Sequence, residues 1–327
     1  MMDERILKQA QERAHARATS RQQDLDERAA LPKPKTVADI ARERLSEKDL
    51  EKIAPSSGYP ELDNIIRGFI PGHLYTLTGN ENVGKTSLAC NFAVRVARQN
   101  KKVLYVALEP DNMVVDYIAS VRTNKRFQDV LPDELSFDDQ NIHIYGKDAV
   151  PNLDALVKII EMSERYDLVI IDHVGYFLSA NSNWVQDQSN AIKRLAGLCK
   201  KQKTAIMMIA HLRKRNQSQK KTYVPTSDDI AGSGAFKQDS TEVMIVVRNL
   251  DNPDEGGLVY TGLGTLYVTK TKAGPNGQMQ LIFTDQCANI TSPAEMAAKE
   301  GYSLVGQNGI QHDTTTKPET EQEDFKW

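Results

Sequence analysis

The segment from residue 79 to residue 87 constrains this chain most, because it carries a complete phosphate-binding motif in the right setting. Gly79-Asn-Glu-Asn-Val-Gly-Lys-Thr86 matches the pattern G-x-x-x-x-G-K-[S/T] without exception. It follows a predicted strand and opens a helical pattern, as the motif requires. Glycines let the backbone curl so that N–H groups point at phosphates, and the helix N-terminus reinforces them. We therefore predict a P-loop that binds ATP through Gly79, Asn80, Asn82, Val83, Gly84, Lys85, Thr86 and Ser87.

Three side chains predict a magnesium-assisted site for the terminal phosphates. Lys85 supplies a point charge to them, and the Thr86 hydroxyl is expected to coordinate Mg²⁺. Val169-Ile-Ile-Asp172 is an apolar strand that ends in a carboxylate, the arrangement in which an aspartate anchors the ion or its water. Taken alone, such an aspartate is usually a cap or a turn residue, but the P-loop upstream favours the metal role.

Two further polar side chains end predicted strands. Val106-Ala-Leu-Glu109 follows the P-loop helix, and a carboxylate there can orient and deprotonate the attacking water. The alternative is an exposed glutamate before Pro110. Ile209-Ala-His211 ends another strand, where a polar group can contact the γ-phosphate and report its loss, although a lone histidine is often structural.

Alternating strands and helices from Gly58 onward predict an α/β domain over residues 55–290, built on a mostly parallel central sheet. Apolar strands separated by amphipathic helices are typical of a parallel sheet covered on both faces. Later strands joined by short turns indicate an antiparallel extension. The expected strands are Leu74–Thr78, Val103–Leu108, Leu168–Ile171, Ala205–Ala210, Glu242–Val247 and Leu266–Lys270, and the expected helices are Ser87–Gln99, Leu153–Tyr166 and Gln188–Lys201.

Residues 1–54 are predicted to form a helical N-terminal arm with a linker. Residues 1–31 read as a polar helix that cannot bury enough surface to fold alone, and residues 31–36 as a stiff linker. Thr36 and Asp39 resemble a capping box that starts an amphipathic helix, and Ser46 can start another turn. This helix needs a surface to pack on, either a neighbouring subunit or its own domain.

Residues 291–327 are predicted to form a disordered acidic tail, because the chain turns polar after Ile290. Near the end, four carboxylates precede the aromatic residues Phe325 and Trp327. The tail is either a solubilising end or a docking peptide whose aromatic side chains enter a partner's pocket.

Composition excludes several other classes. The 327 residues contain no run of eighteen apolar residues, and the charged N-terminus lacks the apolar core of a secretory signal. Cys90, Cys199 and Cys287 lie far apart, which predicts reduced thiols and no zinc site. A cytoplasmic protein with no membrane partner follows. The net charge of −3 does not decide whether nucleic acid binds.

Together these residues resemble the RecA-like motor domain of replicative hexameric helicases, the DnaB-like family. Ser57–Gly72 looks like the lead-in to the family's P-loop, and the order P-loop, Glu109, Asp172, His211 is the family's order. Ser227–Gln238 is similar to its DNA-loop motif, and Lys270-Thr-Lys272-Ala-Gly-Pro to the K-x-R-x-G-P segment that reaches into a neighbour's ATP site. The resemblance covers about residues 55–290.

The resemblance implies a RecA-like P-loop ATPase that assembles with itself, as a hexamer, on single-stranded DNA during replication. Glu109 would activate water, while Lys270 and Lys272 complete the neighbour's site. His211 is similar to the phage-type branch, which places the protein in a bacterial or phage-infected cell, with the acidic tail as a contact for a replisome partner. Two departures are Ala231, where the family usually has arginine, and Lys272 in place of an arginine finger.

A basic stripe and a glycine-containing loop are the expected DNA contacts. By itself a basic stretch is usually a solvated loop, but the family places this one on the central channel. A flexible backbone at the second loop would let amides approach phosphates. The residues are Arg213, Lys214, Arg215, Lys220, Lys221, Gly232, Ser233 and Gly234, with Trp184 in the loop 177–188 either stacking on a base or buried.

Two other classes of function compete with a helicase. A recombination or recombination-mediator ATPase similar to RecA or RadA would form filaments and pair strands, and it shares the strand-end glutamate. A nucleotide switch that never hydrolyses ATP would not need Glu109. Duplex unwinding separates the first pair, and single-turnover hydrolysis with and without oligonucleotide tests the switch.

Overall fold

The computed structural model of the chain describes residues 15, 19, 36–108, 111–135, 141–177, 184–212, 226, 230, 233–251, 259–284, 288–299, 302–304 and 310–312. The chain divides into two compact units, residues 1–49 and residues 50–327. This division lies close to the predicted boundary between the arm and the ATPase domain. No helix in the described part of the chain is long and apolar enough to cross a membrane.

Helix α2 (Val37–Lys52) occupies the end of the first unit and begins at the expected capping box. The Thr36 N–H donates to Asp39 Oδ2 at 3.1 Å, and the Asp39 N–H donates to Thr36 Oγ1 at 3.2 Å. The helix then runs without a break to Lys52, so the separate start expected at Ser46 is wrong. Most of the predicted polar helix over 1–31 lies outside the described residues.

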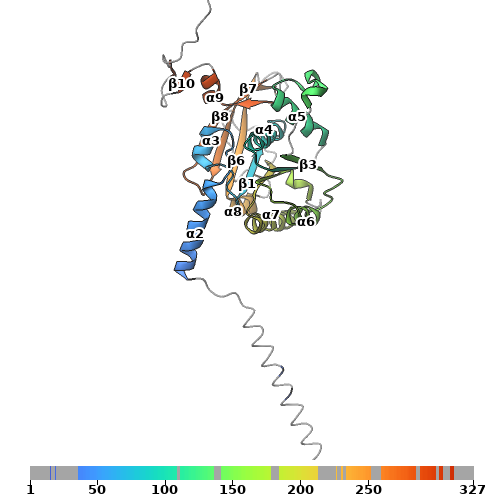
Figure 1. Cartoon of the computed structure of the whole chain (residues 1–327), viewed down its shortest axis with the longest axis vertical. Helices are drawn as coiled ribbons and strands as arrows, with labels where there is room; N and C mark the ends of the chain where they lie inside the picture. The colour runs from blue at the N-terminus through green and yellow to red at the C-terminus, as the bar shows by residue number, and fades with distance from the viewer. Residues whose placement is uncertain are drawn as a thin grey trace, which may run out of the picture. The chain divides into compact units, whose positions relative to one another are not determined.

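The second unit is built on a nine-stranded sheet, which confirms the predicted fold class (Figure 1). Its strand order is β3-β2-β4-β5-β1-β6-β7-β8-β9. The parallel part comprises β3 (Ile142–Gly146), β2 (Val103–Ala107), β4 (Leu168–Asp172), β5 (Ala205–His211), β1 (Leu74–Gly79) and β6 (Glu242–Asp251). The expected antiparallel extension follows as β7 (Val259–Lys270), β8 (Gly277–Phe283) and β9 (Ile290–Thr291).

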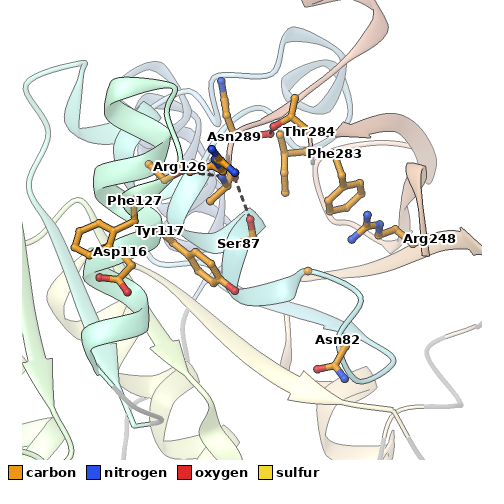
Figure 2. Close-up of a pocket in the computed structure, with 14 residues that line it drawn as sticks. Asn82, Ser87, Asp116, Tyr117, Arg126, Phe127, Arg248, Phe283, Thr284 and Asn289 are labelled. Atoms are coloured by element: carbon orange, nitrogen blue, oxygen red, sulfur yellow. Dashed lines mark hydrogen bonds between the residues drawn. The ribbon is translucent and has the colours of Figure 1, made fainter. Parts of the chain in front are cut away.

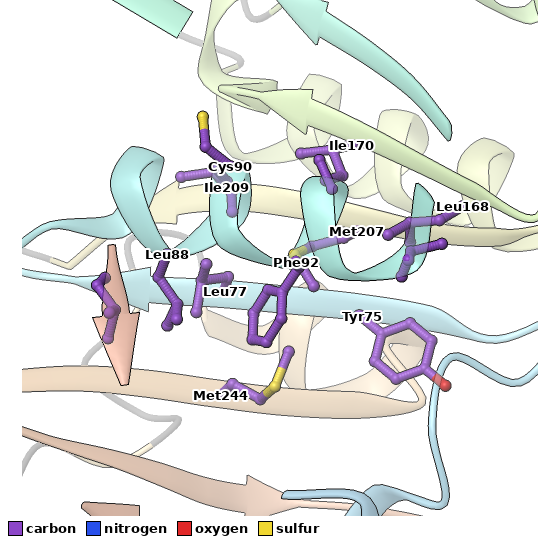
Figure 3. Close-up of a cluster of buried hydrophobic side chains, with 14 of the residues drawn as sticks. Tyr75, Leu77, Leu88, Cys90, Phe92, Leu168, Ile170, Met207, Ile209 and Met244 are labelled. Carbon is purple, nitrogen blue, oxygen red and sulfur yellow. The ribbon is translucent and has the colours of Figure 1, made fainter. Parts of the chain in front are cut away.

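Helices cover both faces of this sheet, because alternate strand residues point to opposite faces and both sets are apolar. One face packs α3 (Pro60–Ile66), α4 (Lys85–Ala97) and α5 (Asp111–Thr123) onto side chains such as Tyr75 and Leu77 (Figure 3). The other packs α6 (Leu153–Met162), α7 (Trp184–Gln202) and α8 (Ser233–Asp239) onto side chains such as Leu74 and Val106. Short 3₁₀ turns lie at Phe127–Asp129 (η1), Pro132–Leu135 (η2) and Val174–Phe177 (η3).

Several element ends differ from the sequence prediction. Helix α7 begins at Trp184 rather than Gln188, so the predicted loop over 177–188 is partly helical. Helix α6 ends at Met162 rather than Tyr166, and strands β6 and β7 are longer than expected. Helix α5 and strand β3 were not expected at all.

The predicted disordered tail also contains ordered elements. Helix α9 (Pro293–Lys299) starts at a capping box, in which the Ser292 N–H donates to Glu295 Oε2 and the Glu295 N–H donates to Ser292 Oγ. Arg95 on α4 donates twice to the Glu295 carboxylate, at 2.5 and 3.0 Å, and so fixes α9 to the domain. A strand pair, β10 (Tyr302–Leu304) and β11 (Ile310–His312), follows. The disorder prediction is therefore wrong for α9, and residues 313–327 lie outside the described residues.

Candidate nucleotide site

The predicted P-loop connects the end of β1 to the start of α4, and its glycines are required by close packing. Gly84 has φ +97°, and a Cβ atom there would lie 2.8 Å from Phe283 Cε1. At Gly79 a Cβ atom would lie 2.7 Å from the Val246 carbonyl oxygen. A larger residue at Gly84 would strain the loop further, because a positive φ is unfavourable for side chains with a Cβ atom. The backbone thus curls as a phosphate cradle at the N-terminus of α4.

Lys85 lies inside this loop. Its ammonium group donates to the carbonyl oxygens of Gly79 at 3.2 Å and Asn80 at 2.7 Å, and the residue is only 7% exposed. A buried ammonium needs such partners, because burial without them is costly. The positive charge is therefore held beside the backbone amides, where a γ-phosphate would enter.

Asp172 ends β4 and is buried, at 3% exposure. Its Oδ2 accepts a hydrogen bond from the Tyr105 hydroxyl at 2.8 Å, which orients the carboxylate. With the Thr86 hydroxyl it offers hard oxygen ligands of the kind that Mg²⁺ prefers. A wider cluster of His, Cys, Asp or Glu that could hold a metal ion is absent from the described ranges. The pair fits a magnesium ion that is coordinated mainly by phosphates and water.

The other strand-end residues lie at the same edge of the sheet. Gly79 pairs with His211 across β1 and β5, and Ala107 pairs with Asp172 across β2 and β4. The ring of His211 contacts the ring of His173 edge to face, with 4.6 Å between ring centroids. Glu109 follows β2 by two residues and lies outside the described residues, so its role as a base stays a prediction.

A cavity of about 450 Å³ opens beside the P-loop, and the sequence prediction missed most of its walls. Phe283 on β8 and Arg248 on β6 form one wall, with the guanidinium carbon 4.3 Å from the ring centroid (Figure 2). Tyr117 on α5 lies on another wall. The Ser87 hydroxyl donates to the Ala288 carbonyl at 3.0 Å and fixes the floor. The cavity is of a size and position suited to the base and sugar of a nucleotide.

Lys270 and Lys272 lie at the opposite edge of the sheet from the P-loop. Lys270 ends β7 and pairs with Val243 near the start of β6, whereas Gly79 pairs with Val246 further along β6. The three strand positions between these pairings correspond to about 10 Å. The Lys270 ammonium donates to the carbonyls of Lys237 and Ser240 at 2.5 and 2.6 Å, at the C-terminus of α8. Neither lysine is placed to serve the P-loop of its own chain.

The expected DNA contacts are described only in part. Residues 213–221 and Gly232 lie outside the described residues, whereas Ser233 and Gly234 begin α8 and are helical rather than part of a loop. An antiparallel bridge between Leu212 and Ile230 joins the two ends of the intervening segment. This segment therefore leaves and re-enters the domain at one point.

Two of the predicted reduced cysteines, Cys90 and Cys199, are free and buried, and burial raises the pKa of each thiol. Cys287 lies outside the described residues. Thiols in apolar surroundings are unreactive, so Cys90 and Cys199 belong to the core and not to a site.

The P-loop at the central strand, the buried aspartate on the strand next but one, and the strand order define a P-loop nucleotide-binding domain of the RecA-like class. More specifically, residues 55–292 match the model of the DnaB-like helicase C terminal domain, and the chain belongs to this family.

Known proteins similar to this chain agree with that assignment. The replicative DNA helicase DnaB of Mycoplasma genitalium is 25% identical over 273 residues, which cover 76% of this chain and 58% of that protein. DnaB of Geobacillus stearothermophilus is 24% identical over 265 residues, covering 74% of this chain and 57% of that protein. The chain thus spans less than two thirds of the length of these relatives.

Two solved structures share the fold. A DnaB-like replicative helicase described with its interactions with primase gives a TM-score of 0.64 at 16% identity, covering 84% of this chain and 71% of that one. A structure described as an isolated ATPase domain superposes with a TM-score of 0.65 at 17% identity, covering 80% of this chain and 99% of that one.

Proposed function

We propose that this chain is the motor of a replicative helicase, a ring of identical subunits that hydrolyses ATP and translocates on single-stranded DNA. The observation that carries the proposal is the separation of two parts of one site. The phosphate cradle lies at one edge of the sheet, and the Lys270–Lys272 segment lies at the other. A segment that cannot reach its own P-loop can complete the site of an adjacent subunit, as the family resemblance implies.

Within one site the residues have distinct tasks. Lys85 and the loop amides hold the β- and γ-phosphates, while Glu109 orients and deprotonates the attacking water. His211 contacts the γ-phosphate from the tip of β5. Thr86 and Asp172 would hold Mg²⁺, which neutralises charge on the phosphates when bound. The base packs against the wall formed by Arg248 and Phe283, since planar cationic and aromatic side chains stack on bases.

The neighbouring subunit supplies the remaining charge. Lys272 is exposed at the far edge of the sheet, and its ammonium stabilises the charge that develops on the γ-phosphate across the subunit interface. Lysine presents a point charge and not a planar fork, so the contact is less directional than an arginine contact.

DNA is bound by the basic segment 213–221 and by the start of α8. Helices α7 and α8 pack against each other through the same core, so movement at one of the two DNA segments is transmitted to the other. The acidic end of the chain is a contact for a replisome partner. The protein acts in the cytoplasm of a bacterial or phage-infected cell.

Unwinding of a forked duplex tests the proposal. Full-length protein with ATP is expected to separate the strands, whereas Lys85→Ala, which removes the phosphate charge, should retain less than about 10% of the ATPase rate. A strand-pairing activity without unwinding would favour the recombination ATPase instead. Lys272→Ala mixed with Lys85→Ala tests the shared site, because only mixed interfaces combine an intact P-loop with an intact Lys272.

A further inference from the structure

A fully buried carboxylate lies beside the segment that carries Lys272. Glu242 begins β6, and its side chain has no exposed surface. Its Oε1 lies 3.1 Å from Nδ1 of His73, a side chain that is 25% exposed. Its Oε2 has no hydrogen-bond partner within the described ranges. A buried carboxylate satisfied on one side destabilises the fold, so packing alone does not account for it.

Lys272 is the second group that acts on this carboxylate. Burial raises the pKa of Glu242, while His73 and then the backbone N–H and the charge of Lys272 lower it. A backbone N–H has this influence only at close range, so the carboxylate faces the chain at Lys272. The Lys272 side chain itself is exposed.

Other contacts hold the rest of the segment from 269 to 277. The Lys270 ammonium is fixed on the carbonyls at the end of α8. Asn276 donates to the Thr269 carbonyl at 2.8 Å, and the Ala273 N–H donates to the Thr271 hydroxyl at 3.0 Å. The carboxylate of Glu242 adds a contact to the backbone of Lys272 itself.

We propose that Glu242, oriented by His73, is a positioning residue that fixes the backbone at Lys272 and so presents its ammonium group to the adjacent subunit's P-loop. This inference rests on the proposed function, in which Lys272 completes that neighbouring site. A lysine side chain is long and flexible, so the direction in which it leaves the backbone decides where its charge can reach.

Mixing of full-length variant subunits tests the inference. Glu242→Met removes the acceptor at similar volume, Glu242→Gln keeps one acceptor oxygen, and His73→Gln removes the orienting ring. For Glu242→Met we expect kcat to fall about tenfold, as for the loss of one hydrogen bond to a charged group, with nucleotide affinity within about twofold of wild type. Glu242→Gln should lose less, about threefold.

The mixtures then distinguish positioning from a general structural defect. Glu242→Met has an intact P-loop, so mixing it with Lys85→Ala should restore activity, whereas mixing it with Lys272→Ala should not. Restoration by Lys272→Ala, or a wild-type kcat for Glu242→Met, would overturn the inference. If Glu242→Met does not fold, Glu242→Gln and His73→Gln carry the same test, and a wild-type kcat for both overturns it.

A separate mixture identifies failure of the underlying function. Lys272→Ala mixed with Lys85→Ala contains no change at Glu242. If that mixture stays inactive while the subunits assemble together, the shared site itself is wrong. If it regains activity while Glu242→Met behaves otherwise than Lys272→Ala, only the positioning role is wrong.

Discussion

Replacement of Phe283 by leucine isolates the contribution of the proposed base wall. Phe283 is 7% exposed and belongs to the core, so truncation to alanine would also leave a cavity that costs about 3–5 kcal/mol of stability. Leucine keeps most of the packing against Gly84 and removes the ring over which the Arg248 guanidinium lies, at 4.3 Å. The variant is therefore expected to fold while losing the planar surface.

The expected loss follows from the interactions that the ring can make. Stacking of a base on an aromatic side chain contributes about 1–3 kcal/mol, and leucine retains some apolar contact, so we take about 1–1.5 kcal/mol. This corresponds to an ATP affinity roughly five- to tenfold weaker. The phosphate cradle is unchanged, because its contacts come from residues 79–86 and not from β8.

Two ligands separate the base from the phosphates. Binding of ATP and of inorganic tripolyphosphate is measured by isothermal titration calorimetry for wild type and for Phe283→Leu. ATP should weaken while tripolyphosphate binds equally to both proteins. Equal weakening of both ligands would show that the change distorts the P-loop, and unchanged ATP affinity would show that the base lies elsewhere.

Three further predictions concern catalysis, stability and the tail. Glu109→Gln should still bind nucleotide while turnover falls about 10²-fold, measured by ATP binding and steady-state hydrolysis, and a parallel loss of binding would make Glu109 structural. Glu242→Met should melt at or above the wild-type temperature at pH 8, and the difference should shrink toward pH 5. The folded-state pKa of Glu242 is raised by burial, so the folded wild type gains stability as pH falls and loses it as pH rises through that pKa. Deletion of 312–327 should tighten single-stranded DNA binding about two- to tenfold at low salt and less at high salt, because the acids then no longer compete for segment 213–221; equal affinities at both salt concentrations would exclude this competition.

Sequence patterns predicted the elements whose signal is local. The strands β1, β2, β4 and β5 were expected because each is a short apolar run bounded by polar residues, and all of them are buried along their length or nearly so. The P-loop was expected because its glycines and Lys85 serve backbone geometry and charge, which the motif specifies directly.

Elements stabilised mainly by tertiary contacts were missed. Helix α5 contains the β-branched residues Val114, Val115, Ile118 and Val121, which lower helix propensity, and its packing against the α4 face of the core overrides this. Strand β3 is a five-residue edge strand that is only half buried, so its hydrophobic pattern is weak. Helix α9 depends on the contact between Arg95 and Glu295, which are 200 residues apart.

Site residues outside the motifs were missed for a related reason, which is the strand order. His73 and Glu242 are 169 residues apart, and each simply precedes or begins an apolar strand. Once β1 is known to pair with β6 in parallel, the residues at the starts of both strands must lie at one edge of the sheet, and the histidine and the carboxylate meet there. The same pairing, continued to antiparallel β7, brings Lys270 back to that edge. A prediction of strand order, beyond the strands themselves, would therefore have placed Glu242 beside the segment that carries Lys272.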